Sequence, residues 1–193
     1  MTEKTLIEEL RAGNTAALRD FVDRYQPLIL QTARGFVHNS EDARDITQDV
    51  FLDVMTNLDR FRGQSGLSTW IYRITVNRSL NFIRSQKKRI PLSEMQTAES
   101  GTIHHPETQL SDPTQKNPVE LLEQQDRSRI LHAALESLPK NQRIAITLAE
   151  YDDLSYQQIA EVMGVTVSSV ESLIFRARKN LQKKLWDCYK KSC

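Results

Sequence analysis

The sequence predicts an all-α protein with two small helical domains joined by a flexible linker, the second domain containing a helix-turn-helix. Apolar residues recur every three or four positions along most of the chain, and no segment shows the alternation of a strand. Residues 90–117 differ because they hold Pro91, Pro106, Pro113 and few large apolar side chains, so they cannot build a core. We therefore predict domains at 1–89 and 118–187, a flexible acidic linker at 90–117 and a tail at 188–193.

The composition limits the classes of protein to which this chain can belong. The 193 residues are 39% hydrophobic and 26% charged, and no run approaches the roughly 20 apolar residues of a membrane-spanning helix. The first ten residues, MTEKTLIEEL, lack the basic-then-apolar layout of a secretion signal, so we expect a cytoplasmic protein. Cys188 and Cys193 are the only cysteines, which leaves neither a disulfide framework nor a Cys/His zinc cage. We expect no metal and no cofactor.

The first two helices have clear end signals. Leu6 to Leu10 predict a short helix that Gly13 can end, and Asn14 can cap the next helix. We expect Pro27 to kink or interrupt that second helix.

The sign of the charge changes between the next two predicted helices. One follows Ser40 and carries six acidic residues against one base over 41–59, whereas residues 60–89 carry eight bases and no acid. We expect Ser68 to cap a long helix that reaches Lys88. The switch predicts two adjacent surfaces with different partners. The apolar face of the third helix is Ala43, Ile46, Val50, Val54 and Leu58.

The basic helix after Ser68 carries a stripe of cations, amides and an aromatic ring. Such groups hold a phosphate backbone and stack on unpaired bases, and the loop before the helix could accept a base swung out of a duplex. The opposite arc is apolar. The stripe is Trp70, Arg73, Ile74, Asn77, Asn81, Arg84 and Lys88, and the apolar arc is Ile71, Tyr72, Val76, Leu80, Phe82 and Ile83.

The second domain ends in a helix-turn-helix, after helices predicted to begin at Pro118 and Pro139. Ser155 and Gln158 form a capping box, Gly164 gives a left-handed exit, and Thr166 caps the following helix. Such a pair places its second helix in the major groove. The predicted duplex contacts are Ser168, Ser169, Ser172, Phe175, Arg176 and Lys179, with Lys183 further along for phosphate.

At this point the chain resembles a known family. The run DARDITQDVFLDVMTNLDRFRGQSGLSTWIYRITVNRSLNFIRSQKKR, then a polar linker and LSYQQIAEVMGVTVSSVESLIFRAR, resembles the extracytoplasmic-function (ECF) group of bacterial sigma factors in the sigma-70 family, over about residues 5 to 186. The resemblance implies a subunit that joins core RNA polymerase through the beta-prime clamp helices and the beta subunit, brings it to a promoter and helps to open the DNA. It also implies an anti-sigma partner, which in this family is often membrane-bound.

The resemblance carries roles to particular residues. Those implied for docking on polymerase are Asp45, Gln48, Asp49, Phe51 and Leu52. Those implied for reading and melting the minus-ten element are Arg60, Arg62, Gln64, Ser65, Ser68, Trp70, Arg73, Asn77, Asn81, Arg84 and Lys88. The helix-turn-helix contacts would read the minus-thirty-five element. Glu171 and Leu173 depart from the family, because bases are common there, and the loop RFRGQSGLSTW departs from the frequent FRGESSFRTW form.

Two other readings stay open at this stage. A stand-alone transcriptional regulator would use the helix-turn-helix on duplex DNA and treat residues 1–89 as a sensor or dimer module. A small helical enzyme would have to use His38, His104, His105 or His132, the only histidines. We find no nucleophile constellation or phosphate loop and expect no enzymatic activity.

Overall fold

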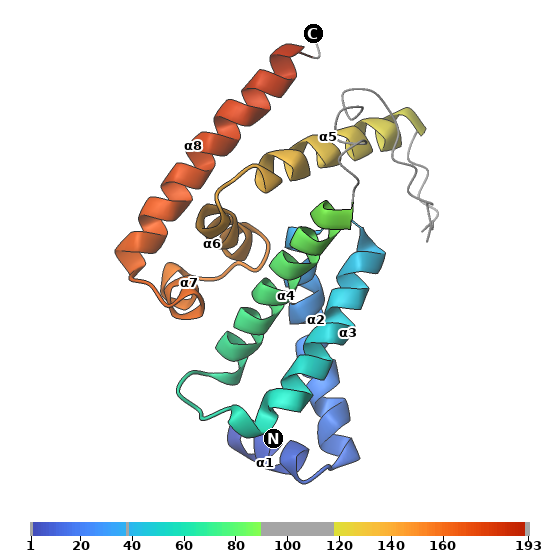
Figure 1. The fold of residues 1–193 in the computed structure, drawn as a ribbon, viewed down its shortest axis with the longest axis vertical. Coiled ribbons are helices and arrows are strands. Elements are labelled where there is room, and N and C mark those ends of the chain that lie inside the picture. The colour runs from blue at the N-terminus through green and yellow to red at the C-terminus, as the bar shows by residue number, and fades with distance from the viewer. Residues whose placement is uncertain (1, 38, 90–117, 192–193) are drawn as a thin grey trace.

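A computed structural model describes residues 2–37, 39–89 and 118–191, which form two groups of helices (Figure 1). The first group is α1 (Glu3–Arg11), α2 (Thr15–Phe36), α3 (Ser40–Asn57), a 3₁₀ turn (Leu58–Arg60) and α4 (Leu67–Arg89). The second is α5 (Pro118–Glu136), α6 (Lys140–Glu150), α7 (Tyr156–Met163) and α8 (Val167–Lys191). The described residues contain no strand, so the all-α prediction is confirmed. The predicted linker, residues 90–117, lies outside the described residues.

The first helix junction follows the sequence signals. Gly13 has φ +77°, a left-handed conformation that suits glycine. Asn14 caps α2 by accepting a hydrogen bond from the Ala16 N–H at 2.9 Å. The predicted end of α1 and start of α2 are therefore confirmed.

Helix α2 runs through Pro27 without interruption, so the expectation that the proline breaks the helix is wrong. Pro27 lies on the exposed side of the helix, where the carbonyl that loses its hydrogen bond can be hydrated. On the opposite side Tyr25 and Ile29 are buried and hold both halves of the helix against the core. Tertiary packing thus offsets the local cost of the proline.

The starts of α3 and α4 differ from the predictions. Asn39, one residue before Ser40, caps α3 by accepting from the Glu41 N–H at 2.8 Å. Helix α4 already begins at Leu67, so Ser68 is not its cap. Instead the Leu67 N–H donates to Oε1 of Glu3 in α1 at 2.7 Å. A carboxylate at the start of a helix is also favoured by the helix dipole.

The first group encloses a core between α2, α3 and α4. Its fully buried side chains come from all three helices and from the short first helix, and they include the predicted apolar face of α3. They are Leu6, Phe21, Ile29, Ala43, Ile46, Val50, Val54, Leu67 and Ile71.

The second group is built around the helix-turn-helix. Ser155 and Gln158 form the predicted capping box, and Gly164 has φ +66° at the end of α7. Thr166 accepts a hydrogen bond from the Ser169 N–H at 3.2 Å and so caps α8. These predicted signals are confirmed. The buried residues of the group include Leu135, Leu148, Ile159, Val162, Val170, Ile174 and Ala177.

The two groups touch. Helix α6 packs on α2, and α7 packs on α4. Figure 1 shows α6 and α7 on the same side of α4. Phe36 of α2 and Val76 of α4 belong to the same buried cluster as the second group's core. The apolar arc of α4 is therefore divided: Ile71 enters the first core, whereas Tyr72, Val76 and Leu80 face the second group.

Candidate nucleic-acid interface

The outer face of α3 presents acidic and amide side chains to solvent. Asp45, Gln48 and Asp49 are exposed, and Leu52 is 66% exposed, which is unusual for a large apolar residue on a well-packed helix. Phe51 is half-buried, and its ring packs edge-on against Phe21 with centroids 5.7 Å apart. The exposed leucine among acids is suited to contact with another protein.

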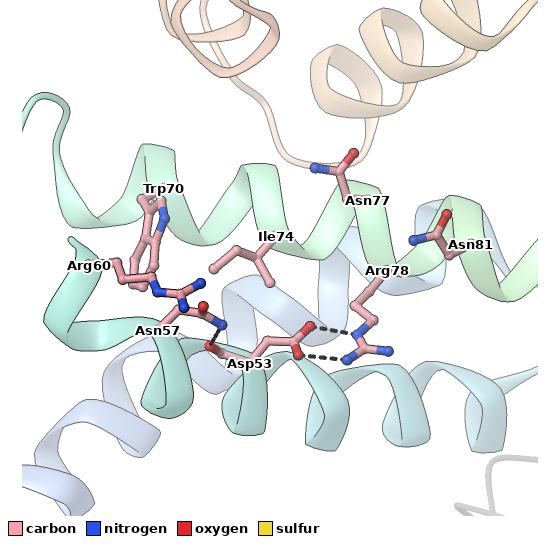
Figure 2. Close-up of a pocket in the computed structure, with 8 residues that line it drawn as sticks. All are labelled: Asp53, Asn57, Arg60, Trp70, Ile74, Asn77, Arg78 and Asn81. Atoms are coloured by element: carbon pink, nitrogen blue, oxygen red, sulfur yellow. Dashed lines mark hydrogen bonds and ion pairs between the residues drawn. The ribbon is translucent and has the colours of Figure 1, made fainter.

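A groove of about 550 Å³ lies between α3 and α4. Figure 2 shows the Asp53 carboxylate, the Asn57 amide and the Arg60 and Arg78 guanidiniums between the two helices, whereas the amides of Asn77 and Asn81 point away from α3. Hydrogen-bond donors and acceptors beside a half-buried aromatic ring suit an unpaired nucleobase. The lining residues are Asp53, Asn57, Arg60, Trp70, Ile74, Asn77, Arg78 and Asn81.

Arg78 joins the two walls of this groove. Its Nε and Nη2 both donate to the Asp53 carboxylate at 2.6 Å, and its Nη1 lies 3.8 Å from Oδ2 of Asp49. The hydrogen bonds to Asp53 raise the pKa of the Arg78 guanidinium. Asn57 donates to the Asp53 backbone carbonyl at 2.8 Å. One cation thus links the acidic face of α3 to α4.

Sequence reasoning did not select Arg78, Asp53 or Asn57 as site residues. Arg78 lies four residues after Ile74 and three before Asn81, so its spacing could have placed it on the predicted stripe. Asp53 and Asn57 are likewise one turn apart on the facing helix.

The predicted α4 stripe is only partly free. Asn77, Asn81 and Arg84 are exposed, whereas Trp70 is half-buried and its ring lies 4.9 Å from that of Phe61. Arg73 donates to backbone carbonyls of α7. The side chain of Lys88 lies outside the described residues.

Five more predicted contacts lie between the 3₁₀ turn and the first turn of α4. Arg60 lines the groove, and Figure 2 shows its guanidinium above Asn57. Arg62 and Gln64 are exposed and Ser65 is half-buried. Ser68 instead makes a side-chain hydrogen bond to Tyr25, so it faces the domain interior.

The recognition helix α8 presents the predicted duplex face. Every one of its predicted contacts is exposed, and Phe175 is 70% exposed. Arg176 is exposed, and its Nε donates to the Ser172 carbonyl of the same helix at 3.1 Å. Arg178, by contrast, pairs with Glu150 of α6 at 2.8 Å. The exposed contacts are Ser168, Ser169, Ser172, Phe175, Arg176 and Lys179.

Family models account for both groups of helices. Residues 21–89 match sigma-70 region 2, and residues 128–181 match sigma-70 region 4. Together they cover more than half of the chain. The chain belongs to the sigma-70 family. The groove therefore lies in sigma region 2, and the helix-turn-helix in sigma region 4.

Relatives place this sigma factor in the ECF group. It is 35% identical over 185 residues to the ECF RNA polymerase sigma-E factor of Escherichia coli (strain K12), covering 96% of this chain and 95% of the relative. It is 34% identical over 183 residues to the RNA polymerase sigma-H factor of Pseudomonas aeruginosa, covering 95% of this chain and 93% of the relative. These matches confirm the resemblance to ECF sigma factors.

Solved structures share the fold. CnrH in complex with the cytosolic domain of CnrY gives a TM-score of 0.64 at 24% identity, covering 96% of this chain and 97% of that chain. The sigma factor RpoE in complex with the anti-sigma factor NepR from Bartonella quintana gives 0.56 at 21% identity, covering 87% and 96%.

Two further features concern metal and membrane. Within residues 2–37, 39–89 and 118–191, no group of three or more His, Cys, Asp or Glu is placed to hold a metal ion. In that part of the chain no single helix is long and apolar enough to cross a membrane, and α7 and α8 pass such a test only as a pair bent by 100°. Cys188 is exposed.

Proposed function

We propose that this ECF sigma factor binds core RNA polymerase through α3, captures an unpaired promoter strand along the α3–α4 groove, and holds upstream duplex through α8. The observation that carries the proposal is the groove, where an acidic face and a face of amides, cations and an indole meet at Arg78. A stand-alone duplex-binding regulator would not need these two faces side by side.

Strand separation would be driven by differential binding. Each base stacked on an aromatic or guanidinium surface contributes about 1–3 kcal/mol. Trp70 and Arg60 would offer this stacking, and Asn81 hydrogen bonds, only to bases that have left the duplex, so binding shifts the equilibrium toward the open bubble. The captured strand and polymerase would then act on neighbouring helices of one domain.

Duplex recognition would belong to α8. Ser168, Ser169 and Ser172 lie nearest the end that meets base edges, and a good base contact discriminates by about 1–3 kcal/mol. Arg176 and Lys179 would contact phosphates. Exposed Glu171 weakens the attraction for phosphate beside them.

The remaining assignments concern partners and chemistry. Core polymerase, through its beta-prime clamp helices and beta subunit, and promoter DNA are the partners, and an anti-sigma factor is the expected inhibitor, since structures of the same fold include one bound to an anti-sigma factor. RNA synthesis would be carried out by polymerase, and this sigma factor would act in the cytoplasm without a reaction of its own.

Run-off transcription tests the proposal. Purified core polymerase is assayed on genomic fragments with and without this protein, and defined transcripts are expected only with it. A chain that binds duplex tightly alone, yet adds no start sites to core polymerase, would support the stand-alone regulator instead.

The docking face has its own test. Asp45→Lys is preferable to a change at Asp49, because a lysine at residue 49 would also repel Arg78 within the domain. We expect Asp45→Lys to weaken binding to core polymerase in a pull-down. Asp23→Lys makes the same charge change at an exposed position of α2 and should leave binding intact. Equal retention of both variants would contradict the assignment.

A further inference from the structure

We infer that helix α1 positions the site of strand capture, because Arg11 and Glu3 hold the two ends of residues 61–66, here called the capture loop. The inference rests on the proposed function and deepens it, since Arg62 and Gln64 of this loop are predicted minus-ten contacts. Arg11 and Glu3 are positioning residues, because the groove itself is lined from α3, the 3₁₀ turn and α4.

Arg11 holds the first end of the capture loop. Its Nη2 donates to the Leu58 carbonyl at 3.0 Å and to the Phe61 carbonyl at 2.9 Å, so a single amino group spans the 3₁₀ turn from which the loop leaves. The Phe61 N–H also donates to the Leu58 carbonyl at 3.1 Å. Arg11 Nε lies 3.8 Å from Oδ1 of Asp59, but Asp59 is almost fully exposed, and such an ion pair contributes little. The two carbonyls therefore account for most of the contact.

Glu3 holds the second end of the capture loop. Its Oε1 accepts from the Leu67 N–H at 2.7 Å, and Leu67 is itself 0% exposed in the first core. Ser68, one residue later, makes a side-chain hydrogen bond to Tyr25 of α2. Glu3 and Arg11 lie eight residues apart in the chain, which is about 12 Å along a helix axis. One rigid helix thus sets how far apart the two ends of the loop lie.

Helix α1 can support the loop because it is fixed to the rest of the domain. Leu6, Ile7 and Leu10 are buried in the first core, and α1 packs on both α2 and the 3₁₀ turn. Thr2 caps the helix by accepting from the Thr5 N–H at 3.2 Å. Figure 1 shows α1 beside the end of α3, where the capture loop begins. Contacts from a helix fixed in this way hold the loop in place rather than moving with it.

The middle of the capture loop is accessible to a ligand. Arg62 and Gln64 are exposed, between the two ends that α1 holds. The ring of Phe61, whose carbonyl accepts from Arg11, lies 4.9 Å from the ring of Trp70 in the groove. Arg11 therefore supports the indole as well as the loop.

Holding the loop at both ends should raise the affinity for an unpaired strand. A mobile loop loses conformational entropy when a ligand orders it, and a loop that is already held in place loses less. The groups that contact DNA stay the same, and neither the docking face of α3 nor the duplex face of α8 depends on the loop. Release of one end should therefore weaken strand binding and leave polymerase binding and duplex binding unchanged.

Three variants of the full chain separate this effect from charge and from stability. Arg11→Gln releases the first end of the loop and leaves every proposed DNA contact in place. Arg19→Gln removes the same charge at an exposed position of α2. Ile29→Val shortens a fully buried side chain of α2 and so lowers stability without touching the loop. Circular dichroism checks that each variant folds.

Hydrogen–deuterium exchange measures how firmly the loop is held. We expect a peptide covering residues 61–67 to exchange at least about threefold faster in Arg11→Gln than in the parent chain, because local opening sets the rate of exchange. Arg19→Gln and Ile29→Val should exchange like the parent there. An unchanged rate in a folded Arg11→Gln would overturn the inference. Should Arg11→Gln fail to fold, Glu3→Ala releases the other end of the loop, and the same outcomes decide.

Strand binding measures the consequence for capture. Each variant is assembled with core polymerase, and the fluorescence anisotropy of a fluorescein-labelled single strand of mixed sequence gives the affinity. We expect Arg11→Gln to bind the strand at least about threefold more weakly than the parent and the two controls. Its affinity for core polymerase and for a labelled duplex of the same length should be unchanged. Equal strand affinity despite faster exchange would overturn the link between the position of the loop and capture.

Two other outcomes are distinct from these. A loss of strand affinity of the same size in Ile29→Val would show a general effect of stability and would also overturn the inference. Failure of the proposed function would show as a parent sigma factor that adds neither strand binding nor run-off transcripts to core polymerase. The inference would then fall with it, even if the loop still exchanged faster in Arg11→Gln.

Discussion

At the scale of single residues, Arg78 is the point where two surfaces of the region 2 domain meet. Its guanidinium makes two hydrogen bonds to Asp53 and lies near Asp49, while its helix carries the amides proposed to contact DNA. A planar guanidinium holds a carboxylate at two atoms, which a lysine cannot do. Arg78 therefore adds a polar link to the apolar packing that holds α3 against α4.

Asp53→Asn tests this link. The change removes one charge from a two-point ion pair of partly exposed groups, and such pairs contribute up to about 1 kcal/mol. We expect the free energy of unfolding in urea to fall by up to about that amount. Asp45→Asn alters the same charge at an exposed position of α3 and should have little effect. Equal losses would mean that the pair adds nothing specific.

A second prediction at this scale compares two arginines of α8. Arg176→Gln and Arg178→Gln remove the same charge, but Arg178 pairs with Glu150 of another helix, whereas exposed Arg176 donates to a carbonyl of its own helix. We expect Arg176→Gln to weaken upstream duplex binding and to lower the slope of log affinity against log salt by about one. Fluorescence anisotropy over a salt series measures both quantities. An equal loss for Arg178→Gln would show a general effect of charge rather than a contact.

At the scale of helices, local signals located most boundaries. Asn14, Ser155, Gln158 and Gly164 act through residues two or three positions away, so their spacing in the sequence was sufficient. The start of α4 was predicted wrongly because its acceptor, Glu3, lies 64 residues away in the chain. Pro27 was misjudged for a similar reason, since the packing of its helix is not local.

Glu3 should therefore stabilise α4 rather than α1 alone. Glu3→Ala removes the acceptor of the Leu67 N–H, and loss of a helix cap costs about 1 kcal/mol. Glu3→Gln keeps an acceptor oxygen and should lose less stability. Urea unfolding followed by circular dichroism compares the two variants. A loss of equal size in both would indicate that the charge near the helix dipole, not the hydrogen bond, is what stabilises α4.

At the scale of the whole molecule, the sequence predicted two helical groups but not their contact. The sequence marks the apolar arc of α4 as a single face, because periodicity tells that a side chain is buried and not which neighbour buries it. Arg73 was predicted as a DNA contact from its place on a polar stripe, and its engagement by α7 depends on residues 88 and 89 positions further along. The exposed faces of α3 and α8, by contrast, lie where their spacing indicated.

The state in which the two helical groups are in contact, here called the closed state, should depend on pH through Asp152. Burial, with a smaller contribution from Asp153, raises the pKa of Asp152 to about 6 despite the hydrogen bond from Thr32, and its Oδ2 is buried without a partner. Tyr72 of α4 faces it, and burial together with the Asp152 charge raises the pKa of Tyr72 to about 12. Once the domains separate, Asp152 should return toward its ordinary pKa of 3.8. The closed state thus binds the proton more tightly.

Low pH should favour the closed state. The proton-linked stabilisation of the closed state is complete below about pH 4 and is lost as the pH rises through about 6. We expect the fraction of molecules whose two helical groups are in contact to increase between about pH 7.5 and 5. The distance between spin labels at Arg19→Cys and Lys184→Cys, both exposed positions, measures this fraction in a chain whose Cys188 and Cys193 are replaced by serine. Asp152→Asn should be more closed at neutral pH and insensitive over this range. The same pH response in Asp152→Asn would assign the titration to another group.

The divided apolar arc of α4 also bears on how the protein behaves when it is alone in the cell or the test tube. Phe36, Val76 and Leu80 are covered only while the two domains are in contact. Separation of the domains without a partner therefore exposes an apolar patch on one domain and the complementary apolar patch on the other. Two such molecules could then bury each other's apolar patches by exchanging domains. Contact between the two domains would therefore keep this apolar surface covered and limit aggregation of the free initiation factor until it binds polymerase.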